Sequence, residues 1–428
     1  MTIAVTIYIP VFKYIESAPT ISVYYLRHDM TSEERHENRY RRRVAKRRER
    51  EILRGTKYTN TIDIFGTLAL DEAFKLSRKG TDWKASVQKY GRKRLVNARK
   101  SSNLLLDGNW RPKGFYNFTI FERGKLREIK SVHISERCVQ SSLCNNALVP
   151  IIRPKLIYDN GASIKGKGTD FFIKRLVEHL RYHIRKHGIV GGIYLFDFSS
   201  YFANILNAPL KNEVRRLVID DLVFSVYEKC IDAFGPVGLG LGSQVSQISA
   251  VFYPNSVDHL VKDRLRVHGY GRFMDDGYII CHDICRLKEI VDLFEKKCAS
   301  LGIKLNKKKC HIVKFGDDFK ILKTRFRITA SGKIIRRIDR TTITRERHRL
   351  RSYRRFINDG IATFDDVKLW FHSWLCSKLR VRSFQVFYNM IAYFNLIFKE
   401  FGEYHPPKTK KRSHKVLDFV SRSTRRAA

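Results

Sequence analysis

Three aspartates stand where predicted buried strands end, and their pattern suits metal-assisted phosphoryl transfer. Asp197 closes the apolar run 193–196, and Asp275 and Asp276 separate two apolar runs. A strand end presents a carboxylate in a fixed position. Carboxylate oxygens are preferred ligands of hard cations, and phosphoryl transfer depends mostly on positioning and on charge stabilisation by such ions. We therefore predict a site for two Mg²⁺ ions, with Mn²⁺ as the alternative metal.

Two other interpretations of these residues have less support from the sequence. An Asp-Asp pair alone is weak evidence because aspartate is common in turns, but Asp197 and the Gly-rich residues 238–247 add two further elements in order. Residues 161–168 are nearly a phosphate-cradling P-loop. The fit fails because Gly168 follows Lys167 at the position where a magnesium-binding hydroxyl is required, and Thr169 comes one place late. The sequence therefore disfavours a P-loop nucleotidase.

The charge balance indicates a polyanionic partner. Lys and Arg number 83 against 42 Asp and Glu, which gives a net charge of +41. Such an excess is too large for an ordinary solvated surface and is typical of nucleic-acid-binding proteins. The 28 Phe and 20 Tyr residues interleave with the basic residues, and most of them are expected in the core. Hydrophobic residues make up 43% of the chain, enough for several packed subdomains.

The eight cysteines and the N-terminal residues indicate the cellular compartment in which the protein is expected. The cysteines are scattered without a Cys-x2-Cys pair, so neither a zinc site nor a disulfide framework is indicated. Reduced cysteines are typical of intracellular proteins. The first 26 residues lack the basic start of a secretory signal, and no apolar run is long enough to span a membrane. We predict a cytoplasmic protein without membrane attachment, and we treat residues 1–29 as an upstream extension outside the domains that matter for function.

Helices and hairpins must position these side chains. A strongly basic helix is predicted over residues 32–54, where repulsion between clustered arginines favours contact with nucleic acid. Residues 115–120 and 126–134 resemble two strands joined by a basic turn that could grip a triphosphate. Helices are predicted over 170–186, ending at Gly188, and over 210–234 and 248–266. The Gly-rich residues 238–247 lie before the last of these helices, where the backbone can approach a ligand closely.

With these residues in view, the chain resembles reverse transcriptases of the prokaryotic, non-retroviral kind over residues 115–330. The resemblance implies an α+β right-hand polymerase, with fingers and palm built from an antiparallel sheet and helices, followed by an α-helical thumb. It implies four parts: a basic, mostly helical N-terminal extension (1–114), fingers and palm (115–335), a thumb (336–405) and a basic disordered tail (406–428).

The resemblance also assigns roles to the acidic residues and to one aromatic ring. It implies that Asp197, Asp275, Asp276 and the backbone carbonyl of Phe198 hold the metal ions. Phe273 stands where the family usually has tyrosine. Phe202, five residues after the first aspartate, corresponds to the family's bulky aromatic that blocks the 2′-hydroxyl of a ribonucleotide. Because that hydroxyl is the local feature that separates the two sugars, the ring favours dNTPs over NTPs.

Further positions match the family's nucleotide-binding motifs. Gly242, Ser246 and Gln247 belong to a segment that resembles a motif usually reading Gln-Gly-x-x-x-Ser-Pro, and both ends depart from it, with Leu241 in place of Gln and Gln247 in place of Pro. The form here resembles the variant in reverse transcriptases of diversity-generating retroelements, with related forms in abortive-infection and other phage-defence enzymes. The remaining matched positions are Lys309 near the pyrophosphate, with Lys308 as its competitor, Lys125 and Arg127 at the triphosphate, and residues 319–325 as the primer-grip hairpin.

The resemblance and the residues together predict an RNA-directed DNA polymerase, a nucleotidyltransferase that extends a primer 3′-hydroxyl. Its expected partners are an RNA template and primer, the RNA–DNA hybrid and dNTPs, with a cognate structured noncoding RNA or a small accessory protein as further candidates. The biological role would be that of a retroelement, including the diversity-generating kind, or phage defence. The alternative is an RNA-binding, maturase-like protein on the same scaffold with little polymerase activity.

Overall fold

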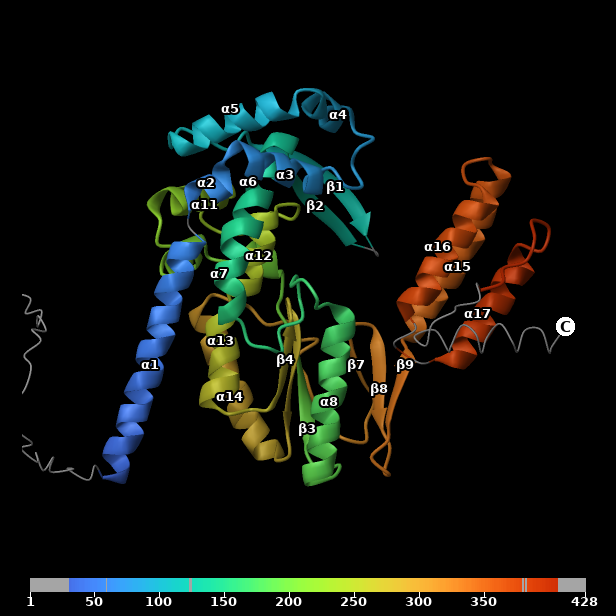
Figure 1. The fold of residues 1–428 in the computed structure, drawn as a ribbon. Helices are drawn as coiled ribbons and strands as arrows, with labels where there is room; N and C mark the ends of the chain where they lie inside the picture. The colour runs from blue at the N-terminus through green and yellow to red at the C-terminus, as the bar shows by residue number, and fades with distance from the viewer. Residues whose placement is uncertain (1–30, 59, 123–124, 379–380, 382, 407–428) are drawn as a thin grey trace, which may run out of the picture. The chain divides into compact units, whose positions relative to one another are not determined.

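The computed structural model describes residues 31–58, 60–122, 125–378, 381 and 383–406 (Figure 1). The chain divides into two units, residues 1–52 and 53–428. Helix α1 (Ser32–Lys57) continues through Gly55, past the predicted end at residue 54, because a single glycine costs a helix only about 1 kcal/mol. The predictions for residues 1–29 and for the tail from 407 onward lie outside the described residues.

An antiparallel sheet of four strands carries the predicted site. Its order is β4 (Gly269–Phe273), β5 (Asp276–Cys281), β3 (Gly192–Asp197) and β6 (His311–Lys314). All six residues of β3 are buried, because the strand lies inside the sheet and both of its faces are covered. This explains why the sequence of β3 is a continuous apolar run rather than an alternating one.

Helices cover both faces of this sheet (Figure 1). Leu176 of α8 (Thr169–His187) belongs to the same buried cluster as Leu195 of β3. On the other face, Phe294 of α14 (Ile284–Ser300) packs 4.7 Å from the ring of Phe196. Alternate residues of β3 therefore anchor two separate hydrophobic clusters, and this double packing fixes the strand that ends at Asp197.

Helix α8 agrees with its predicted range to within one residue, and Gly188 ends it with a positive φ of 68°. The prediction of one helix over 210–234 is wrong. The chain forms α10 (Asn207–Arg215) and α11 (Asp221–Asp232), because the Asp220 side chain accepts a hydrogen bond from Val223 N at 2.8 Å and starts a new helix.

The prediction of one helix over 248–266 is also wrong. The chain instead forms α12 (Gln244–Phe252), α13 (Asn255–His259) and a π-helix (Leu260–Arg264). Pro254 lies between α12 and α13, where a proline lacks the N–H that would continue the helix.

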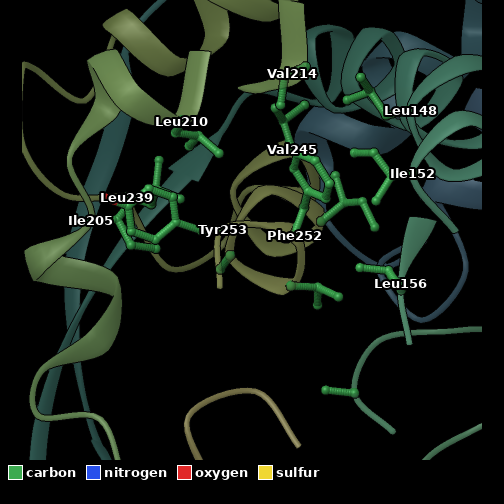
Figure 2. Close-up of a cluster of buried hydrophobic side chains, with 14 of the residues drawn as sticks. Leu148, Ile152, Leu156, Ile205, Leu210, Val214, Leu239, Val245, Phe252 and Tyr253 are labelled. Carbon is green, nitrogen blue, oxygen red and sulfur yellow. The ribbon is translucent and has the colours of Figure 1, made fainter. Parts of the chain in front are cut away.

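Four helices come before the central sheet: α2 (Thr61–Phe65), α3 (Thr67–Ser77), α4 (Ala85–Arg92) and α5 (Arg94–Leu106). Helices α2, α3 and α5 contribute to the same core as the sheet, whereas α4 packs in a smaller separate cluster. Phe65 and Leu105 are fully buried in a cluster with α6 (Ile134–Leu143), the π-helix Cys144–Leu148 and α7 (Val149–Ile152). Figure 2 shows part of this cluster, in which Ile152 lies beside Val245 of α12. Residues from 61 onward, which we expected within an N-terminal extension, therefore share a core with the following elements.

Two further hairpins and a helical bundle complete the described chain. Strands β1 (Phe115–Glu122) and β2 (Lys125–Val132) pair antiparallel, as predicted. Strands β7 (Phe319–Ile321), β8 (Thr324–Ile328) and β9 (Ile334–Ile338) form a second sheet, in which positive φ angles at Leu322 and Lys323 turn the chain between β7 and β8. Helices α15 (Arg340–Asn358), α16 (Phe364–Lys378) and α17 (Phe384–Ile397) surround a separate apolar cluster.

The fold class is α+β with a right-hand polymerase architecture, as predicted. Among the described helices, none has the length and apolar character to cross a membrane.

Candidate active site

The three predicted acidic residues meet at one end of the central sheet. The register of β3 and β5 places Asp197 directly opposite Asp276. Phe198 N donates a hydrogen bond of 3.0 Å to the backbone oxygen of Asp275, which joins the chain after β3 to the turn between β4 and β5. Asp197 is buried, with 6% of its surface exposed. The structure thus brings together side chains that lie almost 80 positions apart in the sequence.

Crowding of these carboxylates changes their protonation. Burial, followed by the charges of Asp275 and Asp197, raises the pKa of Asp276 to about 7. Burial also raises the pKa of Asp275, to which the charge of Asp197 contributes, while Lys309 and Arg127 oppose the shift. Three carboxylates in a partly desolvated position repel one another, so the site favours a proton or a cation.

Two side chains from the segment before β6 contact Asp197. Lys309 Nζ lies 2.6 Å from Asp197 Oδ2, and Asn306 Nδ2 donates to Asp197 Oδ1 at 3.1 Å. Asn306 N also donates to the backbone oxygen of Asp197 at 2.8 Å. Burial works against the charge of Lys309, but the hydrogen bond to Asp197 and the nearby carboxylates outweigh it and raise its pKa. The contact with Asp197 places Lys309 at the acidic site, although its side chain, like that of Lys308, is largely exposed.

A buried ion pair supports the turn that carries Asp275 and Asp276. Arg272 and Asp258 are both fully buried, with 2.7 Å between Arg272 Nη2 and Asp258 Oδ2. Arg272 Nη1 also donates to the backbone oxygen of Met274 at 3.0 Å, where the backbone has a positive φ of 58°. The sequence reasoning missed this pair. Its signal was an arginine inside the otherwise apolar and aromatic strand β4, which requires an internal partner.

Tight packing against the turn explains a glycine there. A Cβ added to Gly277 would lie 2.1 Å from the ring of Phe196, so the residue after Asp276 must lack a side chain. Phe273, which stands where the family usually has tyrosine, packs its ring 5.7 Å from Phe172 of α8.

The P-loop-like residues 161–168 have a structural role beside the same turn. Gly161 N donates to the backbone oxygen of Arg272 at 3.0 Å, and Arg272 N donates to the backbone oxygen of Asp159 at 3.2 Å. Lys167 Nζ donates to the backbone oxygen of Tyr158 at 2.5 Å, and burial lowers its pKa. Lys167, the residue that would bind a phosphate in a P-loop, therefore contacts its own loop instead. This agrees with the sequence argument against a P-loop.

A cleft of about 710 Å³ brings together three of the six residues predicted to bind the nucleotide. Phe202, Gly242 and Gln247 line it, together with Met274 from the turn between β4 and β5. Gly242 has a positive φ of 111°, and Lys130 N of β2 donates to the backbone oxygen of Leu241 at 3.0 Å. This hydrogen bond joins the Gly-rich residues 238–247 to the β1–β2 hairpin.

The predicted nucleotide-binding residues have different surroundings. Gln247 Nε2 donates to Ser163 Oγ at 2.8 Å, so one end of its amide is already engaged. Ser246 does not line the cleft; it is fully buried, and within the described part of the chain its hydroxyl has no hydrogen-bond partner. Arg127 lies near enough to Asp275 to lower the pKa of that carboxyl. Lys125 begins β2, and its side chain lies outside the described residues.

The donor set fits hard cations, although no site is preformed. Three carboxylates without cysteine or histidine among them favour Mg²⁺ or Mn²⁺ over softer metals. In the described ranges, no group of three or more His, Cys, Asp or Glu side chains is already arranged to hold a metal ion. Lys309 Nζ lies 2.6 Å from Asp197 Oδ2, so a metal ion bound at this oxygen would have to compete with the ammonium group.

Comparison with solved structures finds telomerases at low similarity. The apo telomerase of Candida tropicalis truncated from its C-terminal domain is 12% identical, with a TM-score of 0.41 over 53% of this chain and 55% of that chain. Telomerase from Candida albicans in complex with a TWJ fragment of telomeric RNA is 12% identical, with a TM-score of 0.43 over 73% and 62%. The apo telomerase of Candida tropicalis is 15% identical, with a TM-score of 0.44 over 67% and 56%.

The chain thus spans between about half and two thirds of those telomerase chains, and likeness at this level carries no argument about function. No curated protein matches the sequence. The informative match is to a protein family: residues 121–341, more than half of the chain, match the family described as "Reverse transcriptase (RNA-dependent DNA polymerase)". This chain belongs to the reverse transcriptase family.

Proposed function

We propose that the chain is an RNA-directed DNA polymerase that adds dNTPs to the 3′-hydroxyl of a primer paired to an RNA template. The observation that carries the proposal is the meeting of Asp197, Asp275 and Asp276 at one sheet end within a reverse transcriptase domain. In this reaction the primer 3′-oxygen attacks the α-phosphorus of the nucleotide, and pyrophosphate leaves. The reaction makes the protein a nucleotidyltransferase.

The acidic residues would hold the metal ions. Asp197, Asp275 and the backbone carbonyl of Phe198 would bind two Mg²⁺ ions, with Asp276 supporting and Mn²⁺ as the alternative. Such ions lower the pKa of an attacking hydroxyl and neutralise the oxygens of a leaving group. Lys309, whose pKa is raised, keeps its proton at neutral pH and would give it to departing pyrophosphate.

The cleft beside the acids would select the nucleotide. The ring of Phe202 lines the cleft and would meet a 2′-hydroxyl, so the proposal includes preference for dNTPs. Gly242 would let the backbone approach the base pair, and Gln247 would orient that loop through its bond to Ser163. Arg127 and Lys125 would contact the triphosphate from β2, with Ser246 as support beneath the pocket.

Nucleic acid is the proposed partner along the rest of the chain. The net charge of +41 supports binding of an RNA template, a primer and their RNA–DNA hybrid, because each neutralised phosphate releases counterions. Basic helix α1 is a candidate contact, since its exposed face carries a run of arginines. We propose helices α15 to α17, within residues 336–405, as the thumb, residues 115–335 as fingers and palm, and residues 1–114 as a basic N-terminal region.

We further propose a role in a retroelement, including the diversity-generating kind, or in phage defence. The departure from the common family motif at Leu241 and Gln247 supports this choice. Either role would supply a cognate structured RNA or a small accessory protein as partner, and either would act in the cytoplasm.

Primer extension tests the proposal. Purified full-length chain is given an RNA template with an annealed primer and Mg²⁺, with dNTPs and NTPs in parallel reactions, beside the Asp275→Ala variant. We expect extension with dNTPs that is lost in the variant, while RNA binding persists because the basic surface supplies it. RNA binding with no extension from any primer would favour the maturase-like scaffold instead.

A further inference from the structure

A second groove, with a volume of about 380 Å³, lies at the end of the central sheet away from the three aspartates. It is lined by the C-terminal half of α8, the start of β4, the end of β5 and the start of α14. Gly269 and Ile280, which are paired across β4 and β5, line this groove. They lie four residue pairs along the two strands from Phe273 and Asp276, which are paired beside the turn between β4 and β5. At about 3.3 Å per residue, the separation is roughly 13 Å, so this groove is distinct from the nucleotide cleft.

Aromatic rings form the walls of the groove. The rings of Tyr182 and His268 have centroids 4.2 Å apart, and those of His187 and His282 are stacked at 4.3 Å with an interplanar angle of 6°. Burial lowers the pKa of both His187 and His268, aided by neighbouring positive charges, so these two rings are neutral near pH 7. Neutral flat rings are the surfaces on which unpaired nucleobases stack.

Positive charge surrounds the rings. Lys186, Arg266 and Arg286 line the groove, and no acidic side chain of the described residues does. Arg286 is paired with Glu289 at 2.8 Å, outside the groove lining, whereas Lys186 and Arg266 are exposed at its rim. Arg266 has a positive φ of 54°, a conformation that costs energy for a residue other than glycine and is often found at binding sites. The cations could contact the phosphates of a nucleic acid while the rings contact its bases.

We propose that this groove binds a single-stranded segment of nucleic acid, with a base stacked on the exposed rings and phosphates at Lys186 and Arg266. The groove would thereby hold a strand outside the polymerase site. A metal ion is a poor alternative, because the described residues contain no ready cluster of metal ligands there. An acidic peptide would use the cations but has no need of two pairs of closely packed rings, one tilted and one stacked. The proposal does not depend on catalysis, since none of the three aspartates takes part.

Photochemical crosslinking tests this site directly. Full-length chain, both unaltered and as Asp275→Ala, is irradiated with a thiouridine-substituted oligouridylate or a thiothymidine-substituted oligothymidylate, in the presence of excess primer–template duplex. Crosslinked peptides are then mapped. We expect crosslinks within residues 179–187 and 266–286 in both proteins, and comparison of the two probes shows whether RNA or DNA is preferred.

Variants separate the groove from the rest of the basic surface. Tyr182→Ala with His268→Ala should reduce crosslinks at the groove about tenfold, the consequence of losing one base stack, while crosslinks elsewhere remain. Lys288→Ala, which removes an exposed cation of α14 outside the groove, should leave them unchanged. Tyr182 and His268 are exposed, and thermal unfolding checks that the double variant is folded. If it is not, Lys186→Glu with Arg266→Glu replaces it, with Lys288→Glu as control.

Two results would overturn the proposal. One is the absence of crosslinks in both groove segments with either probe. The other is crosslinking at the groove that polyglutamate abolishes and the ring variants leave unchanged, since that would identify the groove as a site for acidic protein.

Discussion

Lys309 Nζ lies 2.6 Å from Asp197 Oδ2, so the lysine neutralises the carboxylate at the centre of the proposed metal site. Asn306 holds the other oxygen of the same carboxylate at 3.1 Å. A metal ion binding at Asp197 must compete with this contact. In the proposed reaction, metal binding would release Lys309 from Asp197, and the lysine could then give its proton to the departing pyrophosphate.

Replacing Lys309 by alanine should slow nucleotide addition by about 10²- to 10⁴-fold, the range for loss of a general acid. The same change should strengthen Mg²⁺ binding, because Asp197 loses its competing ammonium partner. Single-turnover incorporation and a Mg²⁺ titration measure the two effects. Lys308→Ala is the matched control and should resemble the unaltered chain. Equal effects at both positions would show that the contact with Asp197 has no special role.

The pKa of Asp276 predicts a pH-dependent stability. Because this pKa is raised to about 7, the folded chain binds a proton that the unfolded chain has released, and stability falls as the pH rises from the ordinary aspartate range through 7. Asp276→Asn should therefore raise the unfolding temperature at about pH 8 and have little effect at about pH 4. Mg²⁺ should stabilise the unaltered chain at the higher pH. A difference between the two proteins that is independent of pH would contradict the assigned protonation.

Phe202 should control the choice of sugar. Replacing it by alanine opens the cleft where a 2′-hydroxyl would lie, and we expect the preference for dNTPs over NTPs to fall by about 10- to 200-fold, the range for a steric difference in a pocket. The ratio of kcat/KM values for a matched dNTP and NTP measures this. The kcat/KM value for the dNTP serves as the internal control. An unchanged ratio would show that another group excludes ribonucleotides.

The buried pair Arg272–Asp258 should be essential for the turn. Removing one partner leaves an uncompensated buried charge, so Arg272→Met or Asp258→Asn should cost about 3–5 kcal/mol in free energy of unfolding. The double variant should lose less than the sum of the single changes. Denaturant unfolding of the four proteins measures this coupling, and additive losses would argue against a direct interaction.

Much of the site could be predicted because its signals are local. Asp197 and Asp276 close or open apolar strands, and an apolar run followed by a carboxylate is visible in the sequence alone. The end of α8 at Gly188 is equally local, because a left-handed residue there favours glycine. The expectation that the three acids meet needed the family resemblance, since only the β3–β5 register brings them together.

The missed features depend on distant or cooperative contacts. The ion-pair partner of Arg272 lies 14 positions away in α13. The backbone hydrogen bond from Arg272 to Asp159 joins it to a loop more than 100 residues earlier. The break before α11 depends on the side chain of Asp220, whose capping role is not apparent within a pattern that predicts a single helix. The division at residue 114 followed the start of the family resemblance at residue 115, whereas the buried positions of Phe65 and Leu105 depend on contacts with later helices.

The rate of single-dNTP addition to a primer on an RNA template, measured against Mg²⁺ concentration, tests the central claim most directly. The unaltered chain and Asp292→Asn, a change of an exposed acid on α14, should give the same saturable dependence. Asp197→Asn and Asp275→Asn should show no addition at any Mg²⁺ concentration while still binding the primer–template. Addition at an unaltered rate by either of these two variants would contradict the assignment of the three aspartates as the polymerase site.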